Sequence, residues 1–326
     1  MKKNIILKLT FTIALLPVIF TQNSFGKIFP PSNDSLYEHE TLKGHKFIVN
    51  SYIGTPFIQT FLQSRLGAGQ TVNLKIPTIK IDTLEVIQLR GDLIYTNLDI
   101  EYQQMIKDWM AFRVKLLIAG KLGTKPGALI SEGVNAASGY ELGWMFKLYQ
   151  NDEFALSGSI DLFNKSYTII DLNSFIQGVI DSGKITPSNR LVKSYSTVRA
   201  GGALKFAYAF NRTFGFIGNF NAQFGESIDV TDIDKWYFEY GGIFDADLLP
   251  VQNVPIGFSL GFYHNSLPLT SEQIQSEPNN ILLGINYTGK QDLNLGLEIN
   301  YQTYKPLDFE DNIKFVNMSL NMRYFF

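Results

Sequence analysis

The sequence predicts an all-β protein: a single transmembrane antiparallel up-and-down β-barrel of about 12 strands. Three observations lead to this fold class. Segments in which apolar and polar residues alternate recur along most of the chain, as expected for strands with two different faces. Tight connections alternate with longer ones. The last segment, 316–326, has an apolar residue at every even position and ends on Phe326.

The amino-terminal segment is predicted to be a secretory signal peptide covering residues 1–26. A basic start is followed by an apolar run over 5–20, which is interrupted by Lys8 and Pro17. That run is shorter than the roughly 20 apolar residues of a spanning helix. Small residues then lead to cleavage after about Gly26.

Residues 27–54 precede the barrel, which is predicted to occupy 55–326. The Pro-Pro-Ser-Asn-Asp stretch at 30–34 favours an extended, solvated chain. Two interpretations stay open for this segment. It is either a loose lead outside the barrel or a plug that folds into the lumen.

The predicted strands follow in chain order. The first lies within 55–76, where two alternating runs are candidates. About eleven further segments alternate apolar and polar residues, at close to the length of a tilted membrane-spanning strand. They are 94–102, 112–118, 140–148, 154–162, 198–210, 214–224, 236–244, 254–262, 281–287, 293–301 and 316–326.

The connections predict the topology. Tight connections near 107, 151, 212, 250 and 290 alternate with longer ones near 130, 180, 230, 270 and 308. Short turns at one end and long loops at the other are typical of transmembrane barrels. A soluble β-sandwich also shows alternation, but it does not explain this regularity together with outward aromatics and a signal peptide.

The longest connection is predicted to contain a short extracellular amphipathic helix. Leu172, Phe175, Ile176 and Val179 share one face of it at helical spacing. The apolar stripe either docks on neighbouring loops or acts as a lid over the barrel mouth.

The closing strand carries a family resemblance. Met322, Tyr324 and Phe326 alternate on one face, and the chain ends on an aromatic residue. The segment resembles the last strand of Gram-negative outer-membrane β-barrels, whose assembly machinery recognises such an end. The resemblance implies location in the cell outer membrane, with its lipid as partner, and identifies no subfamily. The hatch residues of the fatty-acid and aromatic-hydrocarbon channels are not found in this sequence.

Charged residues on the inward face are candidates for lining the lumen. They form either a polar pathway or a network of ion pairs that braces a closed lumen. The candidates are Asp99, Glu101, Arg113, Lys115, Glu141, Lys147, Asp161, Arg199, Lys205, Glu239, Asp245, Glu298 and Arg323.

Another part of the predicted wall turns small side chains inward. Space on that wall would hold water, a solute path or an inserted segment. The small residues are Ala155, Ser157, Ser159, Gly201, Ala203, Ala207, Ala209, Gly215, Gly257, Ser259 and Gly261.

Other functional classes find little support. A net charge of −2 with no basic run excludes nucleic-acid binding, and the chain has no cysteine for a disulfide or a lipid anchor. His39 and His45 lie near glutamates, but their spacing matches no compact zinc motif, so a solvated surface is expected. His264 and Ser266 share a strand face without an orienting third group. No cofactor, metal or catalytic residue is predicted.

The preferred function is a channel or transporter for passive or facilitated passage of small solutes. The cargo would be polar along the charged wall or apolar through the loop helix. The first alternative is a non-transporting structural or adhesive barrel with a sealed, ion-paired lumen. An outer-membrane enzyme ranks third.

Overall fold

The computed structural model describes residues 40–48, 50–72, 79–81, 84–87, 93–122, 133–170, 178, 181, 192–227, 234–266, 274–306 and 311–326. The predicted signal peptide and the four residues named for the loop helix lie outside these ranges. Within them, no helix is long and apolar enough to cross a bilayer.

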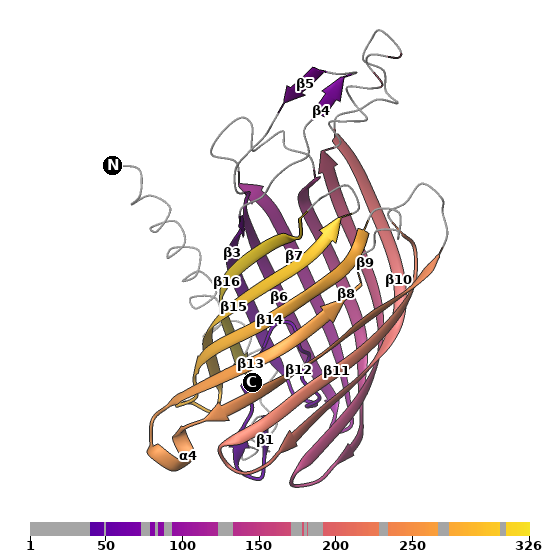
Figure 1. Ribbon diagram of the computed structural model, residues 1–326. Helices are drawn as coiled ribbons and strands as arrows, with labels where there is room; N and C mark the ends of the chain where they lie inside the picture. Colours follow the sequence, from indigo (N-terminus) through magenta and orange to yellow (C-terminus); the bar gives the residue numbers. More distant parts are fainter. Residues whose placement is uncertain are drawn as a thin grey trace.

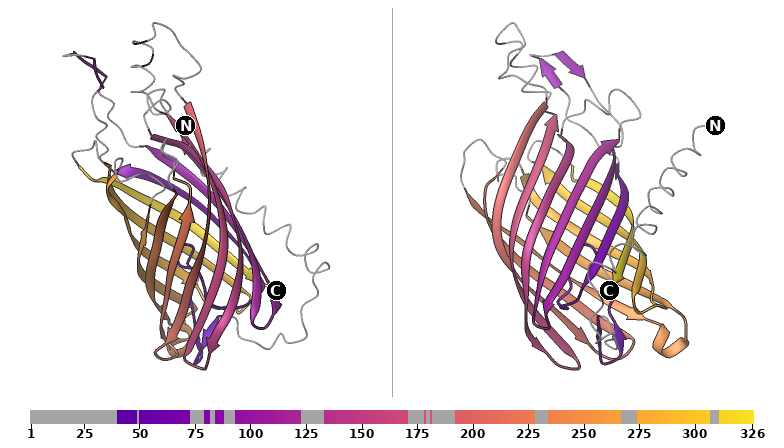
Figure 2. Two further views of the ribbon diagram at one scale, coloured as in Figure 1. Left: turned by 90° about the vertical axis from the view of Figure 1, so that its right-hand side faces the viewer. Right: turned by 180° about the vertical axis from the view of Figure 1, so that it is seen from behind.

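Twelve antiparallel strands close into one barrel (Figures 1 and 2). They are β3 (Phe61–Val72), β6 (Ile94–Lys107), β7 (Met110–Leu122), β8 (Gly133–Gln150), β9 (Phe154–Ile170), β10 (Val192–Ala209), β11 (Phe214–Gly225), β12 (Lys235–Asp247), β13 (Ile256–Asn265), β14 (Ile274–Tyr287), β15 (Leu293–Pro306) and β16 (Ile313–Phe325). Each strand pairs with its neighbour in sequence, and β16 closes the ring on β3 from Phe325–Phe61 to Lys314–Val72. The predicted fold class is confirmed, and the architecture is that of outer-membrane β-barrels.

The two ends of the barrel differ, as the connections predicted. Short connections at 108–109, 151–153, 210–213, 248–255 and 288–292 gather at one end, which we call the turn end. The strand ends at the opposite end of the barrel, such as Ile170 of β9 and Val192 of β10, define what we call the loop end. Figure 1 places the loop end at the top.

Several elements differ from the expectation. Strands β8, β9 and β10 have 18, 17 and 18 residues, longer than the roughly ten needed to cross a bilayer. The short elements were not predicted, because two to four residues are too few to show a strand or helix periodicity. They are β1 (Thr41–Leu42), β2 (His45–Lys46), β4 (Ile79–Ile81), β5 (Leu84–Ile87) and α4 (Leu249–Gln252).

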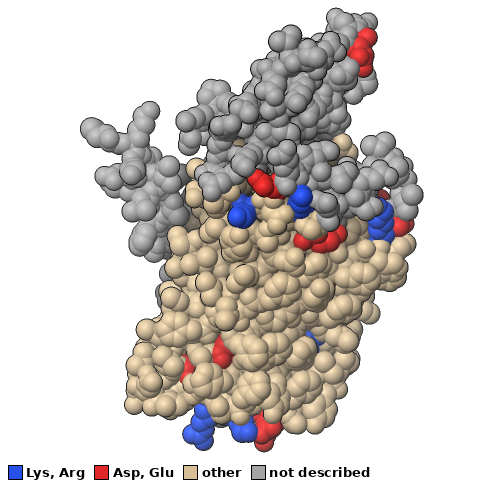
Figure 3. Space-filling view, in the orientation of Figure 1, with Lys and Arg blue, Asp and Glu red and all other residues tan. Residues whose placement is uncertain are grey.

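The outer wall is apolar. Large side chains such as Ile160, Trp236 and Phe244 are 66%, 60% and 59% exposed. In Figure 3, charged residues gather toward the two ends, and few charged atoms show on the wide band between them. Aromatic pairs lie near both ends, for example Trp109 with Phe146 and Phe224 with Trp236. Such a band with aromatic borders matches the hydrocarbon layer and its interfaces.

The inner wall is polar over much of its area, because alternate residues of each strand face inward. The exception among the described residues is an apolar part of the inner wall near the turn end of the lumen. There Leu42, Phe47, Ile53 and Phe57, which precede the first barrel strand, form a buried cluster with inward residues of several strands. The described residues that precede β3, 40–48 and 50–60, therefore lie inside the barrel.

Candidate functional site

Residues 40–48 and 50–60, which we call the inserted segment, enter the lumen from the turn end. The β1–β2 hairpin contacts residues of the short turns: Lys43 pairs with Glu153, and the Lys46 ammonium donates to the Lys290 carbonyl. Glu153 raises the pKa of Lys43. Burial lowers the pKa of Lys46, against the opposing effect of nearby carboxylates. The hairpin thus occupies the turn-end mouth.

The hairpin turn needs unusual backbone angles. Lys43 and Gly44 have φ values of 52° and 75°. Two consecutive positive φ values match the twist of a tight hairpin, and glycine adopts them without a Cβ penalty. The side chain of Arg212 lies against Gly44, at 3.5 Å from the position of an added Cβ.

Small residues of the inner wall receive the inserted segment. A Cβ added at Gly215 would lie 2.4 Å from His45 Nε2 and 2.6 Å from the Phe47 ring, and one added at Gly257 would lie 2.4 Å from Ile48 Cδ1. Such separations are shorter than any tolerated contact. The inserted segment therefore packs against part of the small wall predicted from the sequence, including Gly215, Gly257 and Ser157.

Buried polar contacts hold the segment across the lumen. His45 Nε2 lies 2.9 Å from Asp245 Oδ1, and the backbone N–H of Ile48 donates to Asp245 Oδ2 at 2.7 Å. His45 is fully buried. The expectation of a solvated His45 is therefore wrong, because the segment around it enters the lumen and gains a carboxylate partner.

Glu40 and Arg323 form a second buried tether, at 2.5 Å between Oε1 and Nη1. Arg323 also donates to Gln63 Oε1 and lies over the Phe61 ring, 4.0 Å from its centroid. Since β3 and β16 are the first and last strands of the barrel, this cluster joins the inserted segment to the barrel closure.

The apex of the inserted segment reaches the middle of the lumen. The Asn50 side chain accepts hydrogen bonds from the backbone N–H groups of Tyr52 and Ile53, at 2.8 and 3.2 Å, and so forms a local turn. Ser51 donates through its backbone N–H to Glu298 at 3.1 Å. The chain then descends, because the carbonyls of Phe57 and Gln59 accept from Gln103.

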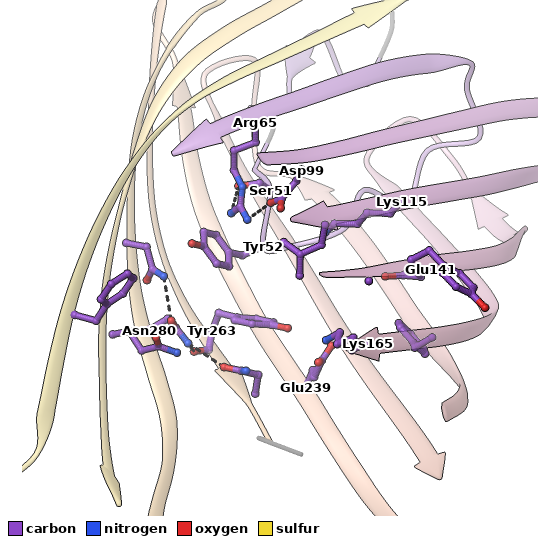
Figure 4. A pocket seen from close by; sticks show the side chains of 18 residues that line it. Ser51, Tyr52, Arg65, Asp99, Lys115, Glu141, Lys165, Glu239, Tyr263 and Asn280 are labelled. Atoms are coloured by element: carbon purple, nitrogen blue, oxygen red, sulfur yellow. Dashed lines mark hydrogen bonds and ion pairs between the residues drawn. The ribbon is translucent and has the colours of Figure 1, made fainter. Parts of the chain in front are cut away.

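Above the apex lies a cavity of about 300 Å³, which we call the vestibule. Figure 4 shows Tyr52 and Tyr263 between one wall with Asn280 and another wall with Lys115, Glu141 and Lys165. Its lining residues are Ser51, Tyr52, Arg65, Asp99, Lys115, Leu117, Gly139, Tyr140, Glu141, Phe163, Lys165, Glu239, Tyr263, Asn265, Asn280, Asn300, Gln302 and Phe315. A smaller cavity of about 80 Å³ lies against the apex and is lined by Gly54, Arg113 and Lys205, among others.

The predicted lumen-lining residues all occupy inward positions of their strands. Eight of the thirteen are buried, and Glu101, Lys115, Glu141, Lys147 and Glu239 are partly exposed. Their role in a solute path stays a prediction.

The structure brings part of the set together. Arg113 Nη2 lies 2.9 Å from Asp161, its Nη1 lies 3.7 Å from Glu101, and it also pairs with Glu141. Lys205 lies beside this cluster and against Gly54.

Other members stand apart from that cluster. Arg199 stacks on Tyr237, 4.6 Å from the ring centroid. Asp245, Glu298 and Arg323 each contact the inserted segment instead.

One proposed pairing is wrong. The opposite charges of β6 and β7 predict that Asp99 and Glu101 face Arg113 and Lys115. Glu101 does face Lys115, but the register partner of Asp99 on β7 is Leu117, and Asp99 forms its ion pair with Arg65. Arg65 lies on β3, the strand that the sequence defines least clearly, so it was not among the predicted lumen-lining residues. A firm register for β3 would have placed Arg65 on the inward face.

The two outer residues considered for nucleophilic chemistry have separate partners. His264 Nδ1 lies 3.0 Å from Asn279 Oδ1, and its ring stacks on Tyr240. Ser266 accepts a hydrogen bond from the Phe238 N–H at 3.2 Å. These contacts of His264 and Ser266 do not join the two side chains to each other.

Comparisons with known proteins support no closer assignment. No family model matches the sequence, and no curated protein matches it significantly. Among solved structures, the chain is similar to the KdgM porin (8% identity, 82% of this chain and 99% of that one, TM-score 0.41). It is also similar to the NanC porin (7%, 81% and 100%, TM-score 0.47) and to a Pseudomonas aeruginosa FadL homologue (12%, 87% and 96%, TM-score 0.45). With identities this low and TM-scores below 0.5, none of them bears on the function of this protein.

Proposed function

We infer that this protein is an outer-membrane channel for small solutes whose lumen is closed at rest by the inserted segment. The observation that carries the inference is the vestibule: it has a polar and aromatic lining, and its floor is the apex of that segment. With the turn end in the periplasm, solute would enter from the loop end. Passage would then require the apex to move.

The chemistry of the contacts fits a displaceable closure. The inserted segment runs directly into β3, but among the described residues it pairs as a strand with none of the barrel strands. Polar side chains make many of its attachments. Buried ion pairs contribute little net stability, because their desolvation offsets their attraction. Its apolar residues, at about 1.5–3 kcal/mol each, favour the docked form. We therefore expect low and intermittent conductance at rest.

Two complementary variants test this function in planar bilayers. Gly215→Leu with Gly257→Leu overfills the wall behind His45 and Ile48 and should raise conductance severalfold. Gly120→Leu with Gly158→Leu is the matched control, because a Cβ meets nothing closer than 3.4 Å at either position.

A reversible lock provides the opposite test. Because the chain has no cysteine, Ile48→Cys with Gly257→Cys offers a single disulfide between the segment and the wall. The oxidised form should be silent, and reduction should restore the wild-type openings. Equal conductance in the overfilled, oxidised and wild-type proteins would reject a closure by this segment.

The sealed structural barrel is the second candidate. The segment packed across the lumen and the ion-pair cluster around Arg113 favour it. It predicts that no solute passes even when the segment is displaced, which the overfilled variant decides.

A further inference from the structure

The charged side chains of the vestibule differ in whether they have partners. Arg65 pairs with Asp99 and also donates to Ser51, while Glu141 pairs with Arg113. Glu239 accepts from Asn221 at 3.3 Å and interacts with the Tyr263 hydroxyl. The acids and the arginine are therefore already engaged.

Two lysines on the same wall are not engaged in this way. Within the part of the chain that the structure describes, neither Lys115 nor Lys165 forms an ion pair or donates a side-chain hydrogen bond, and both line the vestibule. They stand on β7 and β9, with β8 between them. In the strand register Lys115 stands between Glu101 on β6 and Glu141 on β8, whereas Lys165 stands between Gly139 on β8 and Thr197 on β10. The positive charge of Lys165 is therefore the less compensated of the two.

The opposite wall offers neutral hydrogen-bonding groups. The Asn280 side chain donates to the Tyr263 carbonyl and to Asn265 Oδ1, at 3.0 and 3.2 Å, and accepts from Asn300 Nδ2 at 3.1 Å. Asn300 is 4% exposed, and no donor among the described residues reaches its Oδ1. This chain of amides ends in a buried acceptor, which a ligand hydroxyl would satisfy once the Asn300 side chain turns toward the vestibule.

Two aromatic rings stand between these walls. The centroids of Tyr52 and Tyr263 are 6.1 Å apart, with the planes inclined at 50°. The Tyr52 hydroxyl accepts from Asn317 Nδ2 at 3.4 Å. Amphipathic rings of this kind offer an apolar face together with a polar edge.

We propose that the vestibule binds a small polyhydroxylated monocarboxylate, with its carboxylate at Lys115 and Lys165 and its hydroxyls at the Asn280–Asn300 wall. The proposal rests on the function inferred above and names its solute class. A single negative charge fits, because Glu101, Glu141 and Glu239 stand near the lysines and would repel a second one. The volume of about 300 Å³ lies at the lower end of small-molecule sites, which suits one sugar-sized unit.

Calorimetry on the full-length protein in detergent tests the class with three probes. D-glucuronate carries both charge and hydroxyls, D-glucose only hydroxyls, and acetate only charge. Glucuronate should bind at least tenfold more tightly than either of the others. Equal binding of glucose would overturn the role of the lysines, and equal binding of acetate would overturn the role of the amide wall.

Variants assign the contacts. Lys115→Gln with Lys165→Gln should weaken glucuronate binding about tenfold or more, whereas Lys107→Gln, an exposed lysine near the turn end, should leave it unchanged. Asn300→Leu should weaken glucuronate and spare acetate. Affinity of the wild-type protein for glucuronate should also fall as salt is raised, which needs no variant.

The outcomes separate the two proposals. If glucuronate affinity changes neither in the double lysine variant nor with salt, the proposed ligand class is overturned. The conductance result for the Gly215→Leu, Gly257→Leu variant is unaffected by that outcome. Absent conductance in that barrel overturns the channel, whatever the calorimetry shows.

Discussion

At the scale of single residues, the lumen is organised by a few buried charges with partners far away in the chain. His45 and Asp245 are 200 positions apart, and Glu40 and Arg323 are 283 apart. Each pair links the inserted segment to the barrel wall. Removing one member would leave the other buried without compensation, a cost of about 3–5 kcal/mol.

Arg323→Met tests the Glu40 tether. The uncompensated Glu40 should release residues 40–46 from the turn-end mouth while the barrel stays folded. Limited proteolysis should then cut the segment much faster than in the wild type. Glu40→Gln is the matched variant, with a smaller effect, because the amide oxygen still accepts from Arg323. Unchanged protection in Arg323→Met would show that the tether contributes little.

At the scale of elements, the strands and the inserted segment follow different rules. Each barrel strand alternates its faces, so its inward and outward residues follow from position alone. Glycines at 215 and 257 belong to β11 and β13, yet the reason for their size lies in His45, Phe47 and Ile48. The closing strand β16 shows both effects: it pairs with β3 as a regular strand, and its inward Arg323 contacts the inserted segment.

The end of β16 also bears the predicted assembly signal, which stays a prediction. Tyr324 and Phe326 face outward and contact edge-to-face, with centroids 5.1 Å apart. Phe326→Ala should reduce the amount of assembled barrel in cells severalfold, while the purified protein refolds into detergent normally. Heat-modifiable mobility on gels measures both. A parallel loss in cells and in detergent would indicate a structural role instead.

At the scale of the whole molecule, stability depends on an apolar exterior matched to hydrocarbon. Ile160, 66% exposed on β9, lies in the middle of the outer wall. Its inward neighbour Asp161 is buried beside Arg113. The same strand therefore places an apolar residue in contact with hydrocarbon and a charged residue in the polar lumen, and neither residue would be stable in the other's place.

Ile160→Arg should lower the free energy of unfolding from bilayers by about 2–4 kcal/mol, whereas Ile160→Leu should change it little. Urea titration of the protein in phospholipid vesicles measures the difference. A change near zero for the arginine would mean that this face does not meet the hydrocarbon.

The sequence alone determined the barrel, its closing strand, its short and long ends and the inward position of its charges, because alternation is a local property of each strand. Only the tertiary structure decided the partner of Asp99, the burial of His45 and the vestibule above Tyr52. These depend on barrel closure, which sets strands and a non-periodic segment against one another across the lumen. No periodicity within residues 40–60 records that arrangement, since the small residues that admit the segment lie on distant strands.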